Sequence, residues 1–256
     1  MTDSVSFDRA ADYYDATRSL PEDQMALLIS RLLRELRAGT RCLEIGVGTG
    51  RIALPLMRAG VRMVGVDISR DMLRKLRDKE RGMPLAIADA TRLPFPDRSF
   101  DSAIASHVLH LIPDWRTAAG ELTRVVVPGG VLLASRGAGS RTGWQRAVRR
   151  RFYIEAGDPP WPPGIDRIEQ LDEEMRARGA STAEIEDVKS ESLASISNVL
   201  ASLEKGIFSA CWLLDEDTRL RAAAATRRWA AAEFGDLDAP RPVSHHSDWR
   251  AYRLPE

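Results

Sequence analysis

The sequence predicts an α/β protein in which short strands alternate with helices around a mostly parallel sheet. Three observations lead to this prediction. Short apolar runs recur along the first half of the chain, helical periodicity separates them, and a glycine or an acidic residue ends several of the runs. Strand–helix–strand units of this length form right-handed crossovers between parallel strands.

The first half of the chain gives the clearest pattern. Apolar residues recur at helical spacing from Met25 to Leu36, and Gly39 ends that helix. Further helices are expected from the glycine cluster to Gly60, from about Ser69 to Arg81, and near Trp115–Val126. Strands are expected at Cys42–Ile45, Val61–Val66, Pro84–Ala88, Phe100–Ser106 and Val131–Ser135.

The second half carries weaker signals. Residues 137–164 are rich in arginine, proline and tryptophan and are expected to form an inserted loop or short helix. Two more strands are expected at Thr182–Val188 and Trp249–Leu254. Helices are expected at Ile165–Arg178, through Leu193, Ile196, Val199, Leu200 and Leu203, and at about Glu216–Phe234. We interpret this block as a helical lid; a separate second domain is the alternative, but no linker marks its boundary.

Length and composition are typical of a globular protein that is not stabilised by disulfides. The 256 residues are 44% apolar and 29% charged, and 37 Lys and Arg residues balance 37 Asp and Glu residues. A chain of this size buries roughly three quarters of its unfolded surface, so it needs no metal or disulfide. Zero net charge gives no general attraction to nucleic acid or anionic lipid. Cys42 and Cys211 alone make neither a disulfide framework nor a metal site.

The amino-terminal sequence MTDSVSFDRAADYYDATR lacks the apolar core of a signal peptide. No apolar run reaches the roughly 18 residues that a membrane-spanning helix requires. We therefore expect a soluble, cytoplasmic protein without a membrane span.

A glycine cluster follows the first strand. The sequence Glu44-Ile-Gly46-Val-Gly48-Thr-Gly50 lies where a strand must turn sharply into a helix. Glycine allows positive φ there and lets a ligand approach the backbone. The helix N-terminus behind it offers N–H groups to a carboxylate or phosphate. A tight turn that binds nothing is the alternative.

Two acidic residues end neighbouring strands. Asp67 follows the second strand and Asp89 follows the third. An acidic side chain at such a strand end accepts hydrogen bonds from ribose hydroxyls, and ligands of open α/β sheets bind outside this edge. Each residue alone is more often a cap or a solvated loop residue. Together with the glycine turn they favour an adenosine-type site.

The glycine spacing decides between two cofactor classes. The nicotinamide fingerprint G-x-G-x-x-G needs glycine at position 51, where this chain has Arg51. The sequence instead resembles the class I S-adenosylmethionine-dependent methyltransferases, particularly the small-molecule branch that includes ubiquinone and menaquinone biosynthesis methyltransferases. The resemblance covers residues 7–135 and leaves the C-terminal block unmatched. It rests on FDRAADYYDATR (7–18), LEIGVGTGR (43–51), VGVDIS (64–69), ADATRLPFPDRSFD (88–101), SHVLHLIPD (106–114) and ELTRVVVPGG (121–130).

The resemblance implies a Rossmann-like, doubly wound sheet of seven mostly parallel strands, with an antiparallel C-terminal strand and an inserted helical lid. One domain would span residues 1–256. Cap helices would occupy 1–38, the cofactor-binding core 39–136, the substrate-side insertions and lid 137–247 with one core helix and strand, and the last strand 248–256. Pro128-Gly129-Gly130 would be a turn before the fifth strand.

The resemblance also implies S-adenosylmethionine as cofactor, S-adenosylhomocysteine as product and no metal. Gly46, Gly48 and Gly50 would lie against the methionine part, with Glu44 organising their loop. Asp67 would accept both ribose hydroxyls. The remaining contacts would come from Ile68 and Met72 beside the adenine, Asp89 and Ala90 at its polar edge, the Ser106 and His107 backbone near the methionine amine, and Tyr14 and Arg18 as a cap.

Ordinary packing is the alternative for Met72, and a surface helix for Tyr14 and Arg18. An arginine suits the cap because a guanidinium can hold both oxygens of the methionine carboxylate.

The reaction implied is an in-line displacement that depends mainly on orientation and exclusion of water. His107 and His110 are the candidate general bases, and we assign the role to His110 because of its position and its suitable pKa; packing is the alternative. If His110→Ala leaves methylation within about threefold, the hypothesis fails.

The acceptor is expected to be a small organic molecule. Aromatic residues of the lid are consistent with an apolar acceptor pocket, but their helical spacing is better explained by the lid's own core. The basic run Arg141, Arg146, Arg149, Arg150 and Arg151 would suit a carboxylate, a phosphate or RNA, or simply a solvated helix face. The alternatives are an RNA or protein methyltransferase and a non-catalytic cofactor-binding protein. A nicotinamide-dependent oxidoreductase fits least well.

Overall fold

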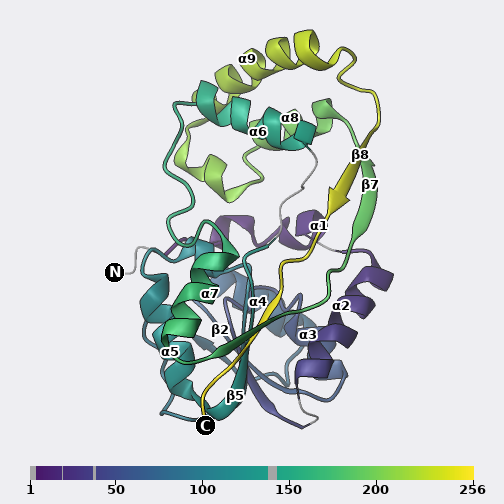
Figure 1. Ribbon diagram of the computed structural model, residues 1–256. Helices are drawn as coiled ribbons and strands as arrows, with labels where there is room; N and C mark the ends of the chain where they lie inside the picture. The colour runs from purple at the N-terminus through teal and green to yellow at the C-terminus, as the bar shows by residue number, and fades with distance from the viewer. Residues whose placement is uncertain (1–3, 19, 37–38, 138–142) are drawn as a thin grey trace. The chain divides into compact units, whose positions relative to one another are not determined.

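The computed structural model describes residues 4–18, 20–36, 39–137 and 143–256 (Figure 1). The chain divides into two compact units. Unit 1 consists of Met1–Gly137, Pro163–Val188 and Ser247–Glu256, and unit 2 consists of Ala138–Pro162 and Lys189–His246. None of the helices in the described part of the chain is long and apolar enough to cross a membrane.

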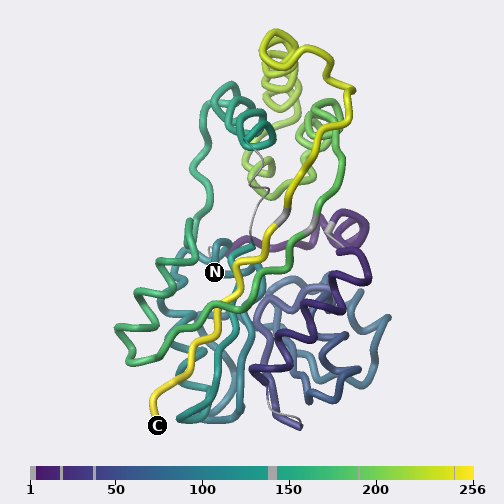
Figure 2. Tube along the Cα trace, turned by 45° about the vertical axis from the view of Figure 1, so that its right-hand side comes forward, coloured from purple at the N-terminus to yellow at the C-terminus, as the bar shows by residue number. Residues whose placement is uncertain are grey.

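Unit 1 is built on a seven-stranded sheet of order β3-β2-β1-β4-β5-β9-β6. Strand β9 is antiparallel to both of its neighbours, and the other pairings are parallel. Figure 2 shows the yellow C-terminal strand beside the green strand β6. The fold class is therefore confirmed. The strands are β1 (Arg41–Ile45), β2 (Arg62–Asp67), β3 (Leu85–Ile87), β4 (Phe100–Ser106), β5 (Val126–Ser135), β6 (Ser181–Glu184) and β9 (Arg250–Arg253).

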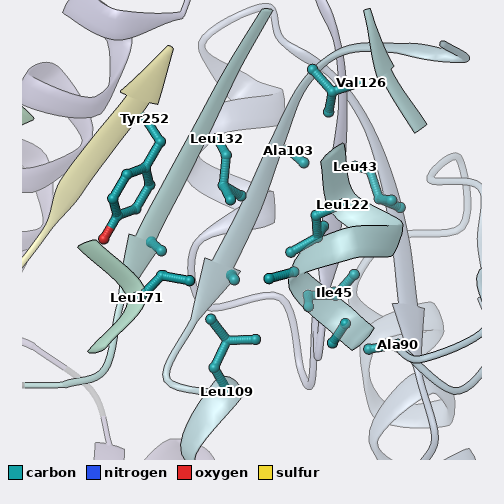
Figure 3. Packing of buried hydrophobic residues seen from close by; sticks show 14 of the residues in the cluster. Leu43, Ile45, Ala90, Ala103, Leu109, Leu122, Val126, Leu132, Leu171 and Tyr252 are labelled. Carbon is teal, nitrogen blue, oxygen red and sulfur yellow. The ribbon is translucent and has the colours of Figure 1, made fainter. Parts of the chain in front are cut away.

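Helices cover both faces of this sheet. Alternate strand residues point to opposite faces, so Leu43 and Ile45 share a buried cluster with α5 and α7, whereas Cys42 belongs to the cluster of α2, α3 and α4. Figure 3 shows the first cluster, with Tyr252 and Leu171 at one end. The unit's helical elements are η1 (Asp8–Ala10), α1 (Tyr14–Arg18), α2 (Glu22–Glu35), α3 (Ala53–Arg58), α4 (Arg70–Lys79), η2 (Leu109–Leu111), α5 (Trp115–Val125) and α7 (Ile168–Ala177).

Polar caps fix where two of these helices begin. The Ser69 hydroxyl accepts the Met72 N–H at 3.2 Å, so α4 starts directly after β2. The Asp114 carboxylate accepts the Thr117 N–H at 3.3 Å and starts α5. A side-chain cap satisfies a backbone donor that the helix itself leaves unpaired.

Strand β5 differs from its prediction. It begins at Val126 rather than Val131 and includes the segment predicted as a turn. Its register to β4 shifts between Phe100 and Ser102, which pair with Val126 and Val131. The extra residues form an irregularity inside the strand. A Cβ on Gly130 would lie 2.7 Å from the Asp101 carbonyl oxygen, so the glycine permits this close approach.

Unit 2 is a helical unit with a two-stranded ribbon and its own buried cluster, which includes Val148, Phe152 and Leu200. The helix predicted at Glu216–Phe234 is α9 with those same bounds. Whether this unit acts as a lid stays a prediction. Its elements are α6 (Gly143–Glu155), β7 (Ser190–Ala194), α8 (Ile196–Glu204), η3 (Ser209–Leu213), α9 and β8 (Arg241–His245).

Two predictions for unit 2 were wrong. The stretch expected to be a loop or short helix contains α6, a helix of 13 residues. Leu193 was assigned to a helix but lies in β7, where it is 70% exposed. The helix starts at Ile196 because the Ser195 hydroxyl accepts the Asn198 N–H at 3.2 Å. Leu193 fits the helical spacing, but it precedes the cap.

Candidate functional site

A pocket opens at the carboxyl edge of the unit 1 sheet. The segments that follow β1, β2, β3 and β4 line it, together with the amino-terminal segment. The pocket thus brings together Tyr14, Gly46, Gly48, Asp67, Ile68, Met72, Asp89, Ala90, Ser106 and His107, all predicted from the sequence as cofactor contacts.

The glycine turn forms one wall. Gly46, Gly48 and Gly50 all have positive φ (60°, 55° and 84°), a conformation that favours glycine. A Cβ on Gly48 would meet no atom closer than 3.8 Å, so this part of the wall is open. A side chain on Gly46 would overlap Val108 instead. The turn thus exposes backbone to the pocket at Gly48.

Gly50 is not among the residues that line the pocket, and its contact with the cofactor stays a prediction. A Cβ there would lie 2.5 Å from Leu76 Cδ1 and 2.8 Å from Leu54 Cγ. Gly50 therefore permits close packing of the turn on helices α3 and α4.

Asp67 connects the glycine turn to the start of α4. One carboxylate oxygen accepts the Gly48 N–H and the other accepts the Ser69 N–H, each at 2.8 Å. Burial raises the pKa of Asp67, against the opposing effect of these two hydrogen bonds. Two backbone donors thus fix the orientation of the carboxylate at the pocket wall.

Glu44 lies in β1 and is only 2% exposed. It does not line the pocket, and among the described residues its Oε2 has no hydrogen-bond partner. Burial raises the pKa of Glu44 to about 8, although attraction to Arg51 and a hydrogen bond from the Ala53 N–H lower it. These contacts tie the carboxyl group to the segment just after the glycine turn.

The segment after β3 presents Asp89 and Ala90 to the pocket. Asp89 Oδ1 accepts the Thr91 N–H at 3.0 Å, and the buried Ala90 belongs to the cluster that covers one sheet face. Met72 likewise serves two purposes, because it is buried in α4 and also lines the pocket.

The segment after β4 brings a serine and a histidine. Ser106 is 7% exposed, and its hydroxyl has no hydrogen-bond partner among the described residues. His107 has φ of 54°, which is uncommon for a non-glycine residue, and its N–H donates to the Ser135 carbonyl at 2.8 Å. Its imidazole packs so close to Gly137 that a side chain there would overlap it. His110 lies in η2, and its side chain is not among the pocket-lining groups.

The amino-terminal segment supplies residues that sequence reasoning missed. Ser4, Val5 and Phe7 line the pocket with Tyr14. The Val5 N–H donates to the Leu111 carbonyl at 3.1 Å. Phe7 and Tyr14 meet edge to face, with ring centroids 6.0 Å apart. The side chain of Arg18 lies outside the described part of the structure.

Apolar residues complete the pocket. Val66, Ala88, Val108, Leu111 and Ile112 line it and were not predicted. Apolar residues near a strand end give no pattern that distinguishes pocket lining from core packing. All five lie within the motifs VGVDIS, ADATRLPFPDRSFD and SHVLHLIPD, and this is the signal that could have pointed to them.

Three arginines of the basic run, all in α6, are engaged within unit 2, while Arg141 lies outside the described residues. Arg150 pairs with Asp158, and Arg151 pairs with Glu155 at 2.5 Å. The Arg149 guanidinium carbon lies 4.3 Å from the centroid of the Phe208 ring. These contacts favour a structural role for the run.

The comparisons with known proteins agree with this geometry. Residues 43–134 match the family model described as "Methyltransferase domain". This part of the chain is similar to methyltransferase domains. It contains the glycine turn, both acidic strand ends and the segment after β4.

Curated relatives of the methyltransferase domain act on different acceptors, by their names. A demethylmenaquinone methyltransferase from Streptomyces avermitilis is 37% identical over 127 residues, which are 48% of this chain and 55% of that protein. A phosphatidylethanolamine N-methyltransferase from Cereibacter sphaeroides is 37% identical over 101 residues, 37% of this chain and 49% of that protein. The chain thus spans about half the length of the curated relatives it matches.

A solved structure extends the likeness in fold. The YcgJ protein from Bacillus subtilis superposes with a TM-score of 0.63 at 20% sequence identity, covering 92% of this chain and all of that one. At this identity the match shows the fold and leaves the reaction open.

Proposed function

We propose that this chain is an S-adenosylmethionine-dependent methyltransferase that acts on a small organic acceptor. The observation that carries the proposal is Asp67. Two backbone N–H groups fix its carboxylate in a pocket wall beside the open backbone of Gly48, at the strand end where a ribose is expected.

The residues present fit the cofactor. The open space at Gly48 leaves room for a ligand against the backbone, and the Ser106 hydroxyl is a buried polar group that lacks a partner in the described structure. A buried polar group of this kind is satisfied by a ligand or water. Asp67 would accept the ribose hydroxyls, Ile68 and Met72 would contact the adenine, and Asp89 with the Ala90 N–H would hold its polar edge.

The methionine end would lie along Gly46 and Gly48, with Ser106 and His107 beside it. Gly50 and Glu44 would shape this end indirectly, and Tyr14 and Arg18 would cover it. When bound, S-adenosylmethionine would supply a methyl group activated by its sulfonium, so that an acceptor lone pair could attack the methyl carbon in line while the carbon–sulfur bond breaks and S-adenosylhomocysteine leaves.

The chain's own contribution would be orientation and the exclusion of water. Val108, Leu111 and Ile112 give the pocket an apolar side, where water binds weakly. Holding two reactants in line can contribute roughly 7–11 kcal/mol to barrier reduction. An acceptor that loses a proton would need a base. His110 remains the proposed base, while His107 is the histidine that lines the pocket.

A small acceptor is favoured over RNA. Three of the five arginines that would suit a nucleic-acid backbone have partners in unit 2, and the net charge is zero. The names of the relatives suggest two acceptor classes for a first panel, a demethylated naphthoquinol and an ethanolamine lipid.

Calorimetric titration with S-adenosylmethionine, S-adenosylhomocysteine and NAD tests the cofactor assignment. We expect micromolar binding of the first two and none of NAD. Asp67→Ala should weaken binding about 100-fold, because it removes the acceptors for two ribose hydroxyls and the hydrogen bond that holds the glycine turn. Each factor of ten in affinity corresponds to about 1.4 kcal/mol of binding free energy. Asp78→Ala, an exposed carboxylate of α4, is the matched control and should bind as the wild type does.

Transfer of labelled methyl groups to the acceptor panel then tests catalysis. Binding without transfer to any acceptor would favour a non-catalytic cofactor-binding protein. Tight binding of NAD, or wild-type affinity in Asp67→Ala, would contradict the proposal.

A further inference from the structure

The amino-terminal segment lies along helix α4 and is attached to it by three aspartates. Asp8 Oδ1 accepts the Ser69 hydroxyl at 2.6 Å and the Asp71 N–H at 3.1 Å. Asp12 pairs with Lys75 at 2.8 Å, and Asp15 pairs with Lys79 at 2.6 Å. Positions 71, 75 and 79 lie one helical turn apart, so the attachments follow a single side of α4.

The attachment at Asp15 differs from the others because it includes the glycine turn. Asp15 Oδ1 accepts the hydroxyl of Thr49 at 2.6 Å, while Asp15 Oδ2 pairs with Lys79. Lys79 Nζ also donates to the Thr49 carbonyl at 3.0 Å. Asp15, Thr49 and Lys79 therefore form a closed set of three contacts, which we call the clasp.

The clasp joins three elements that surround the pocket. Thr49 is 1% exposed and stands between Gly48 and Gly50. Asp15 directly follows Tyr14, which lines the pocket. Lys79 belongs to the last turn of α4. Tyr14 cannot move far from the pocket while the clasp is closed, since its neighbour is held on two sides.

A second attachment reaches the pocket from the other end of the segment. Asp8 holds the hydroxyl of Ser69, whose N–H donates to Asp67. Asp67 in turn holds Gly48. Both ends of the segment are thus hydrogen-bonded to residues that adjoin the proposed ribose contact.

The Asp12–Lys75 pair has no such connection. Its carboxylate side chain is 89% exposed, and exposed ion pairs contribute little. Substitution of Lys75 removes a lysine charge from the same helix as substitution of Lys79 does. The Asp12–Lys75 pair therefore provides an internal control.

We propose that Asp15 and Lys79 are positioning residues that hold the amino-terminal segment closed over the pocket and thereby set the rate at which the cofactor leaves. This inference rests on the proposed function, because it takes S-adenosylmethionine as the ligand. Opening the segment breaks the contacts of the clasp, so the release rate depends on their strength. High salt weakens the ion pair and should accelerate release.

Release of radiolabelled S-adenosylmethionine from the full chain, chased with excess unlabelled S-adenosylhomocysteine, measures this rate. Lys79→Met loses the ion pair and the hydrogen bond to Thr49 and should release label about tenfold faster, as expected for loss of a charged hydrogen bond. Asp15→Asn should show a smaller acceleration, because its amide oxygen still accepts from Thr49. Lys79→Arg should restore slow release, and Lys75→Met should stay within about twofold of the wild type.

The melting temperature of each variant separates this role from a general structural one. Equal release rates for Lys79→Met and Lys75→Met would overturn the proposal, and so would faster release that only follows lower stability. Failure of the wild type to bind S-adenosylmethionine would overturn the cofactor assignment instead.

Limited trypsin digestion without ligand tests the clasp independently of the cofactor. Cleavage after Arg9 or Arg18 should be faster in Lys79→Met than in Lys75→Met, and equal rates would show that the clasp does not hold the segment.

Discussion

A glycine in each unit has positive φ, but the space around the two glycines differs. In unit 1, Gly50 has φ of 84°, and a Cβ there would lie 2.5 Å from Leu76 Cδ1. In unit 2, Gly235 ends α9 with φ of 74°, but a Cβ there would meet nothing within 4 Å. Both positions require a backbone conformation that favours glycine, and only Gly50 also requires the absence of a side chain.

The same contrast extends beyond glycine. Unit 1 places carboxylates and turn backbone at defined points around a pocket, so few residues satisfy each position. The described core of unit 2 is mostly apolar, and apolar residues of similar volume replace one another at a small loss of stability. The family model accordingly matches residues 43–134, all in unit 1.

The largest expected effect tests whether the units are energetically separate. Phe152 is fully buried in unit 2, so Phe152→Ala should destabilise that unit by about 3–5 kcal/mol, the usual cost of emptying an aromatic core position. Scanning calorimetry measures the loss. Affinity for S-adenosylhomocysteine should stay within about threefold, because the described lining of the pocket belongs to unit 1. A large loss of affinity would show that unit 2 supports the site.

The glycine pair gives the next largest effect. Gly50→Ala should lower the free energy of unfolding by about 2–4 kcal/mol, because backbone strain adds to overpacking against Leu54 and Leu76. Gly235→Ala should cost about 1 kcal/mol from strain alone. Urea denaturation of both variants measures the difference, and equal costs would contradict the contrast between the units.

Glu44 predicts a pH dependence of stability. Its pKa is raised to about 8 in the folded chain, so its contribution is most favourable below pH of about 4.5 and is lost as pH rises through about 8. Glu44→Gln keeps an acceptor for the Ala53 N–H and cannot ionise. The variant should gain stability relative to the wild type between these pH values, on the order of 4 kcal/mol at the upper end.

Denaturant unfolding at pH 5, 6.5 and 8 measures this gain. Glu35→Gln, which changes a carboxylate outside the glycine turn, is the control. A constant difference between Glu44→Gln and the wild type over this range would argue that Glu44 is ionised throughout.

The last prediction concerns the rate of methylation and the two histidines. If His110 is the base, His110→Ala should lower the methylation rate well beyond threefold; a change within about threefold, below 1 kcal/mol by transition-state arithmetic, would reject it. Asparagine tolerates positive φ, so His107→Asn should keep the backbone at this position. If the pocket-lining His107 is the base instead, His107→Asn should lower the methylation rate more than His110→Ala does.

Sequence reasoning succeeded where one residue type is needed for a backbone or chemical reason. The glycine turn, Asp67 and Asp89 were predicted because they combine strand ends with turn glycines and carboxylates. It failed where apolar residues have equivalent roles. Val5, Phe7 and Leu111 line the pocket, but their types are equally common in a core. Leu193 matched the helical period, and the cap at Ser195 overrode it.

Residue 51 and strand β5 contrast what a local sequence pattern can predict with what it cannot. An arginine at position 51 breaks a glycine fingerprint and excluded one cofactor pattern from the sequence alone. The irregularity in β5 could not be predicted, because the Asp101 carbonyl that lies close to Gly130 belongs to a neighbouring strand. Contacts between residues distant in sequence leave no local pattern.

The position of β9 between β5 and β6 has a consequence for synthesis of the protein. Residues 250–253 separate two strands that are complete much earlier, and they pair with both. During translation, β6 therefore has no partner in the sheet until the chain has been made through unit 2 as far as residue 253. Its edge stays open to other chains for that time, so chaperone binding and aggregation of the nascent protein should depend on how quickly this last strand is supplied.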